Sequence, residues 1–186
     1  MPLDRRDGIP DTIAYLRADY PKPAWRSHRN FGELSAFWLQ VHDHLRAHGA
    51  EVGRLTAAFR EGQVDPDSFQ RAFVPALNQF LQHLNGHHQI EDRHYFPKFR
   101  ALDPRMGAGF DLLDADHHHI HDALLAAARS GQALLDAVRQ APDARPAADR
   151  HAAEAGQLLA LLTRHLADEE DLVLPAMLHH GERSLD

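Results

Sequence analysis

The chain has no cysteine, and no run of apolar side chains is long enough for a membrane span. Without cysteine there is no disulfide framework, iron–sulfur cluster or thiolate zinc site, so any metal must be held by nitrogen and oxygen. A transmembrane helix needs roughly 18 apolar residues, and a signal peptide needs an apolar stretch behind its basic start. Neither pattern is present, and the sequence therefore predicts a cytoplasmic protein.

Basic residues are scattered along the chain and the formal net charge is -7. Nucleic acid and membrane are therefore not expected as partners, because both call for a basic patch. A length of 186 residues with 44% hydrophobic residues is ordinary for one globular domain. The unusual feature is 16 histidines, which form no terminal tag and require a chemical reason.

Apolar residues recur every three or four positions over four long stretches, which predicts four amphipathic helices. We expect them at about 30–61, from Asp67 or Ser68 to near Arg100, from Gly109 to about 140, and up to about His180. Pro75 and Pro97 fall inside the second helix and predict bends. No stretch alternates as a strand would.

Short connections at 62–67, 103–107 and 141–146 favour an all-α fold, an up-down-up-down antiparallel four-helix bundle. We place the bundle at residues 30–182. Residues 1–29 are expected to form an N-terminal arm with a short helix over 11–20. The sequence does not indicate the role of the arm or the oligomeric state.

A histidine followed four residues later by a glutamate occurs twice, as His87-x-x-x-Glu91 and His165-x-x-x-Glu169. Residues four apart share one face of a helix, so each histidine and glutamate could together ligate a metal or could form a weak ion pair on the protein surface. The two motifs lie 78 residues apart, and prolines follow both at the same spacing. This recurrence in one frame favours metal binding.

Counting residues outward from each connection places seven polar side chains at one level of the core. Buried polar groups without partners cost several kcal/mol, whereas two cations would satisfy them all. Two glutamates could bridge both ions, and five histidines would split three and two, which leaves an open position for a small molecule. The predicted ligands are His42, His87, Glu91, His117, His121, His165 and Glu169.

Two ligand positions have competitors. On the first helix, His44 and His48 are alternatives to His42, and near the end of the chain Glu170 is an alternative to Glu169. A secondary metal role is open for His83. Eight further histidines are expected at the surface: His83, His88, His94, His118, His119, His151, His179 and His180. The mixed imidazole and carboxylate set suits iron, manganese or zinc, and bridging carboxylates favour iron or manganese.

The ordered pattern of histidines and glutamates, with Phe96-Pro97 and Leu174-Pro175 after the two motifs, resembles the hemerythrin-like (HHE cation-binding) family over roughly residues 30 to 180. The resemblance implies an oxo- or hydroxo-bridged centre of two iron ions. It implies that Glu91 and Glu169 bridge the ions and that the histidines are terminal ligands.

The same resemblance implies that the chain binds dioxygen, or senses dioxygen, iron or nitric oxide; peroxide is a further candidate ligand. Oxygen-carrying relatives place the last carboxylate five residues after its histidine, which here is Glu170. Relatives that repair iron centres carry cysteines in an N-terminal segment, and the lack of cysteine argues against that role.

Two other functions compete with this interpretation, and the sequence does not decide whether the chain is an enzyme. A ferritin-like di-metal oxidase or peroxide-handling enzyme needs two Glu-x-x-His motifs, and only Glu91 with His94 fits. A metal-free helical interaction module would have to bury seven polar groups without a partner, which is costly.

Overall fold

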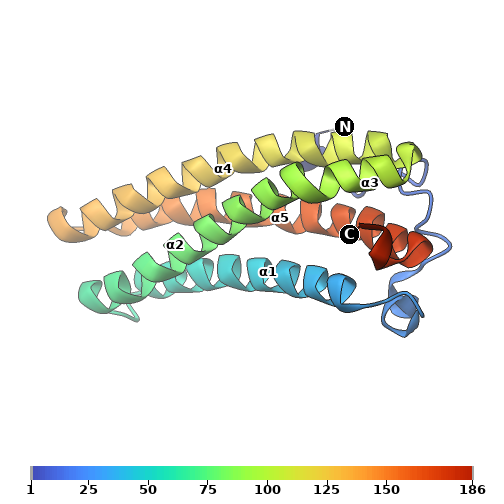
Figure 1. The fold of residues 1–186 in the computed structure, drawn as a ribbon. Coiled ribbons are helices and arrows are strands. Elements are labelled where there is room, and N and C mark those ends of the chain that lie inside the picture. Colours follow the sequence, from blue (N-terminus) through green and yellow to red (C-terminus); the bar gives the residue numbers. More distant parts are fainter. Residues whose placement is uncertain (1, 186) are drawn as a thin grey trace. The chain divides into compact units, whose positions relative to one another are not determined.

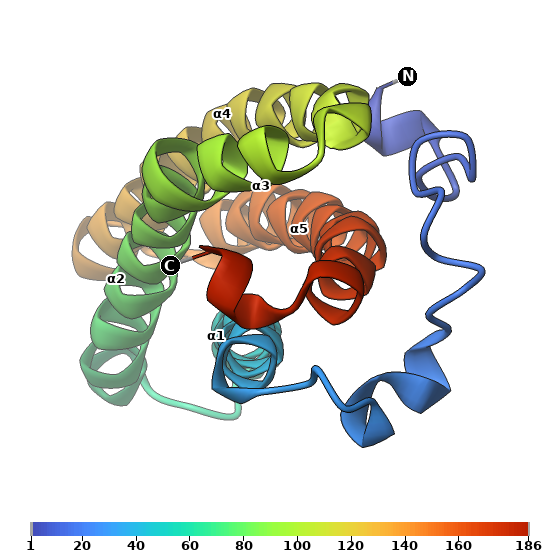
Figure 2. The same cartoon turned by 45° about the vertical axis from the view of Figure 1, so that its right-hand side comes forward.

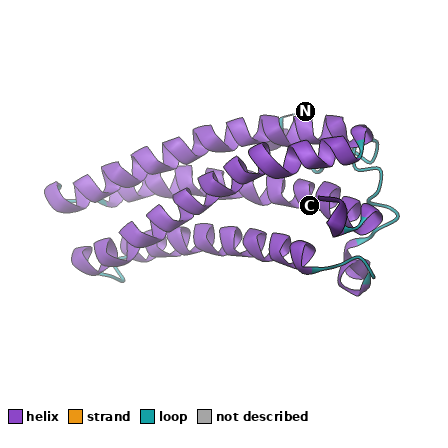
Figure 3. Ribbon diagram, viewed as in Figure 1, coloured by secondary structure: helices purple, strands orange, loops and turns teal. Residues whose placement is uncertain are grey.

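The computed structural model describes residues 2–185, and most of these residues are helical (Figures 1 and 3). No strand occurs among these residues, which confirms the all-α class. The five α-helices are α1 Glu33–Arg60, α2 Pro66–Ile90, α3 Phe96–Leu102, α4 Gly107–Gln140 and α5 Arg145–His180. None of the described helices is both long and apolar enough to cross a membrane.

The predicted second helix is interrupted, because a π-helical segment, Glu91–Tyr95, separates α2 from α3. Its hydrogen bond runs from the Phe96 amide to the Glu91 carbonyl, five residues back. Pro97 follows directly and has no amide hydrogen to donate to the Arg93 carbonyl four residues earlier. The proline predicted a bend, and the chain accommodates it with a wider turn.

Helix ends are fixed by side chains from both near and far in the sequence. Asp65 caps α2 by accepting a hydrogen bond from the Ser68 amide at 2.9 Å, and α2 begins at Pro66, one or two residues before the predicted start at Asp67 or Ser68. The carboxylate of Glu182 accepts from the amides of Gly32, Leu34 and Ser35 at 2.7 to 3.1 Å. The C-terminal segment therefore caps the start of α1.

The described residues divide into two compact units, and each takes segments from α1, α2, α4 and α5. The first unit falls within Met1–Asp43, His87–His118 and Thr163–Asp186, and the second unit comprises His44–Gly86 and His119–Leu162. Every predicted ligand except His121 belongs to the first unit.

In the first unit the N-terminal arm runs from the start of α4 past α5 to the start of α1 (Figure 2). Arg6 is buried, donates to Asp168 of α5 at 2.7 Å, and also donates to Asp116 of α4. Residues 11–20 form turns, so the short helix predicted there was wrong, and 3-10 turns occur instead at Leu3–Arg5 and Lys22–Ser27. Buried ion pairs therefore fix the arm.

The second unit has an aromatic and aliphatic core. Phe69 lies between two rings, with centroids 4.4 Å from Phe59 and 4.7 Å from Phe73. Gly131 allows close packing here, since a Cβ in its place would lie 2.5 Å from a methyl of Leu77. His151 was predicted at the surface, and that prediction was wrong: its side chain is fully buried, with its ring perpendicular to that of Phe73, and is one of the few buried polar side chains described in this unit.

Candidate metal centre

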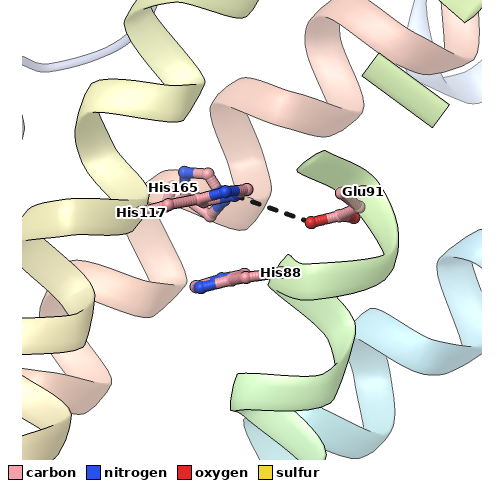
Figure 4. Close-up of side chains that lie close together, drawn as sticks. All are labelled: His88, Glu91, His117 and His165. Carbon is pink, nitrogen blue, oxygen red and sulfur yellow. Dashed lines mark hydrogen bonds and ion pairs between the residues drawn. The ribbon is translucent and has the colours of Figure 1, made fainter. Parts of the chain in front are cut away.

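Two groups of buried side chains in the first unit have the composition of metal sites. One contains His42, His87, Glu91 and Glu169, and the other contains His88, Glu91, His117 and His165. Within each group the potential ligand atoms lie within 4.8 Å of one another. Figure 4 shows the second group, in which side chains from three helical segments point toward one another. Glu91 belongs to both groups, so the two sites share a carboxylate.

Helix geometry explains why Glu91 is shared. A turn contains 3.6 residues, so positions three and four before a residue lie on either side of it, one turn back. His88 and His87 occupy these two positions relative to Glu91. Glu91 is also the first residue of the π-helical segment, a rare geometry that is frequent at functional sites.

Each of the two glutamates has one oxygen toward each group. For Glu91, Oε1 lies 3.1 Å from His87 Nε2 and Oε2 lies 3.6 Å from His117 Nε2. For Glu169, Oε1 lies 3.3 Å from His42 Nε2 and Oε2 lies 3.4 Å from His165 Nε2. Both carboxylates therefore span the two groups, as bridging ligands do.

Three of the histidines have a carboxylate on their second ring nitrogen. His42 Nδ1 lies 3.0 Å from Glu170, and His117 Nδ1 lies 2.7 Å from Asp92. His165 Nδ1 lies 3.5 Å from Asp116, the residue that also accepts from Arg6. Such outer carboxylates fix the tautomer and orientation of metal-binding imidazoles.

Burial and charge act in opposite directions at the two glutamates. Burial, and then the nearby Glu169, raise the pKa of Glu91 well above its ordinary value. Burial also acts to raise the pKa of Glu169, but His42 and the hydrogen bond with His165 lower it well below that value. Burial lowers the pKa of His87 to about 3. Opposed shifts of this kind in one buried cluster are typical of functional sites.

The residues fit metal ions because many of their inward atoms make no hydrogen bond with any described residue. These buried atoms include Nε2 of His42, His87 and His88, both carboxylate oxygens of Glu91, and Oε2 of Glu169. Buried polar atoms are otherwise almost always paired. Imidazole nitrogen together with carboxylate oxygen is a donor set for iron, manganese or zinc.

The structure brings together six of the seven predicted ligands. His42 is fully buried in the first group, while its alternatives, His44 and His48, lie outside both groups. Glu169 is in the first group, and Glu170 instead contacts the outer nitrogen of His42. The exception is His121, which is exposed and belongs to neither group. His94, required by the ferritin-like alternative, is also exposed.

His88 is the inward residue that the sequence interpretation missed, because it was assigned to the surface. It is 7% exposed, and its ring stacks on His117 with centroids 3.9 Å apart. Burial, with the neighbouring imidazoles, lowers the pKa of His88 well below its ordinary value, which keeps the ring neutral. The available signal was the adjacent pair His87-His88, three and four residues before one glutamate.

Comparison with known proteins agrees with this arrangement. Residues 33–177 match the family model described as the hemerythrin HHE cation-binding domain. This match covers most of the chain, which therefore belongs to the hemerythrin HHE cation-binding family. No curated protein and no solved structure matches the chain.

Proposed function

We propose that the chain is a hemerythrin-type protein whose first unit holds two iron ions and offers one of them to dioxygen or a related small molecule. The observation that carries the proposal is the pair of glutamates whose two oxygens face different histidine groups. An up-down-up-down antiparallel bundle of α1, α2, α4 and α5 is part of the proposal, and the short connections between these helices support it.

The ligands divide unequally between the ions. One ion would be held by His42 and His87, and the other by His88, His117 and His165, with Glu91 and Glu169 shared. The first ion therefore has one protein ligand fewer, which leaves room for a small molecule. Two ferrous ions would supply an open coordination position and electrons. Binding of dioxygen, nitric oxide or peroxide needs the open position, and reduction of the bound molecule needs the electrons.

Aromatic side chains line the side of the ion with fewer ligands. Trp38 donates from Nε1 to Oε1 of Glu169 at 2.6 Å and so fixes the orientation of this bridge. Its ring lies 6.2 Å from that of His42 and 4.9 Å from that of Tyr95. Trp38 is 4% exposed, so these rings exclude water from the position that we assign to the small molecule.

The test is to count iron after anaerobic loading with ferrous iron, and then to record the absorption spectrum as air is admitted and removed. We expect two irons per chain and a spectrum that changes with oxygen. His88→Ala should retain one iron, while His121→Ala, the matched control on an exposed imidazole, should retain two. Equal iron content in both variants would contradict the assignment of His88.

A second pair of variants tests the bridge. Glu169→Gln should lose iron, because it replaces one of the two oxygens with which this carboxylate would bridge the ions, whereas Glu170→Gln should retain both ions with weaker affinity. Loss of an outer carboxylate typically costs about 10- to 100-fold in metal affinity. The opposite ranking would move the bridge to Glu170.

A further inference from the structure

A second histidine cluster lies in the second unit and is separate from the candidate metal centre. His44, His48 and His83 line an open groove of about 910 Å³ between α1 and α2, and its other lining residues are Pro75, Asn78, Gln79 and Gln82. His44 and His48 are four residues apart on α1 and therefore share one face. Their rings are nearly parallel, with centroids 6.3 Å apart.

The imidazoles of His48 and His83 have the spacing of two ligands on one ion. Their Nδ1 atoms lie 3.4 Å apart. Zinc binds imidazole nitrogen at 2.0–2.1 Å, so two nitrogens on one tetrahedral zinc are separated by about 3.3–3.4 Å. A direct hydrogen bond between the rings is a poorer explanation, because such bonds are usually 2.7–3.2 Å long.

Packing beneath the groove fixes this separation. Gly49 follows His48, and a Cβ at this position would lie 2.7 Å from a methyl of Leu159 and 3.1 Å from the ring of Phe80. Phe80 is three residues before His83 on α2. The absence of a side chain at Gly49 therefore allows α2 to approach α1 at the level of the two imidazoles.

The chemistry of the lining selects the ion. Imidazole nitrogens and amide side chains line the groove, and the described lining includes no carboxylate. Magnesium and calcium prefer carboxylate oxygen, whereas zinc and copper are suited to imidazole. Burial, with charge from His48 and His44, lowers the pKa of His83, which favours the neutral form that binds metal.

We propose that His48 and His83, with His44 one turn away, form a second metal site that takes one zinc or another imidazole-preferring divalent cation. Gln79 lies one turn before His83 on α2, and its amide oxygen or water would complete the coordination. The site does not depend on the proposed function, because its residues are distinct from the ligands of the iron centre.

The test is zinc binding to the iron-loaded chain, with iron and zinc counted separately after equilibrium dialysis at neutral pH. We expect one zinc per chain and no change in iron. His48→Ala and His83→Ala should each weaken zinc binding by about tenfold or more, equivalent to at least about 1.4 kcal/mol. His119→Ala, which removes an exposed histidine of α4 outside the groove, should leave zinc binding unchanged.

His48→Gln separates a lost ligand from lost packing, because it keeps a polar side chain of similar size. It should weaken zinc binding as His48→Ala does, with the helical content of the chain unchanged. Zinc that enters only by displacing iron, or that binds the two alanine variants as tightly as the wild type, would overturn the proposal. So would a wild-type chain that binds no zinc.

Discussion

Helix α5 carries two fully buried histidines, 14 residues apart, and the two units surround them differently. His165 in the first unit lies beside Asp116 and Glu169. Burial acts to lower its pKa, but those carboxylates raise it overall. His151 in the second unit has no carboxylate partner among the described residues; the Ser130 hydroxyl lies 3.0 Å from its Nδ1, and burial lowers its pKa to about 4.

The comparison shows that burial of an imidazole does not by itself indicate a metal ligand. Both histidines lie in the same helix and are equally inaccessible, yet only one belongs to a group of converging nitrogen and oxygen atoms. The first unit stabilises buried polar groups with opposite charges and, as we propose, with metal ions. The second unit tolerates one neutral imidazole in an otherwise apolar core. The difference between the units can be tested in four ways.

The largest effect is expected from removing the carboxylate that both groups share. Glu91→Gln keeps the size of the side chain but removes a bridging ligand from both ions. We expect loss of both irons and of the stabilisation that they contribute, about 4 kcal/mol per ion when free iron is 1,000 times its dissociation constant. The measurement is iron content together with thermal unfolding, with and without iron.

Glu51→Gln on the exposed surface of α1 is the control for this variant, because its partner is the exposed Arg54. It should keep both irons and the full shift in melting temperature on iron loading. A Glu91→Gln chain that retains two irons would show that the sites do not share this residue.

The next largest effect concerns the arm. Arg6→Met leaves Asp116 and Asp168 buried without their guanidinium partner, and breaking such a pair costs roughly 3–5 kcal/mol. Urea unfolding measures this loss. Arg17→Met is the control, because Arg17 is partly exposed in its pairs with Asp11 and Asp171 and should cost about 1 kcal/mol or less. Equal losses in the two variants would contradict a special role for the buried ion pairs of Arg6.

A third prediction concerns pH and the second unit. The folded-state pKa of His151 is about 4, below the ordinary value of 6.5, because burial disfavours the charged ring. Its contribution to stability is therefore complete above pH 6.5 and is lost as the pH falls toward 4. His151→Gln does not titrate, so the stability of the wild type relative to this variant should fall by about 3 kcal/mol between pH 7 and pH 4. Urea unfolding of both chains at the two pH values measures this, and a constant difference would contradict it.

The smallest effects concern two glycines of the second unit. Gly131→Ala introduces a methyl group 2.5 Å from Leu77 and should destabilise the chain by about 1 kcal/mol or more. Gly156→Ala meets no atom within 4 Å and should stabilise α5 by roughly 0.5–1 kcal/mol. Thermal unfolding compares the two, and a shift in the same direction for both would contradict the close packing at Gly131.

The sequence predicted the helices and most of the candidate site because both depend on a regular helical repeat. The 3.6-residue spacing and equal distances from short turns predicted one level of the core for six residues that the structure brings together in the first unit: His42, His87, Glu91, His117, His165 and Glu169. The position of α1 was predicted to within three residues at its start and one at its end. The number of α-helices was predicted wrongly, because α2 and α3 were predicted as one helix.

The misassignment of His88 and His121 has a local physical cause. The count outward from the connection predicted at 103–107 assumes unbroken α-helices on both sides. A π segment, a short helix and a 3-10 turn instead lie between α2 and α4. In addition, α4 begins at Gly107 rather than Gly109. His121 also lies about 40° further around α4 than His117, because four residues exceed one turn.

The π segment has a consequence for how relatives of this chain can vary in length. Deleting one residue between positions 91 and 95 would restore an ordinary α-helix and leave the following residues facing nearly the same way, because the wide π turn already accommodates the extra residue. Phe96 and Phe99 would therefore stay in the core of the first unit. A relative without the wide turn can therefore be one residue shorter at this point, and its alignment with this chain should carry a one-residue gap beside the glutamate.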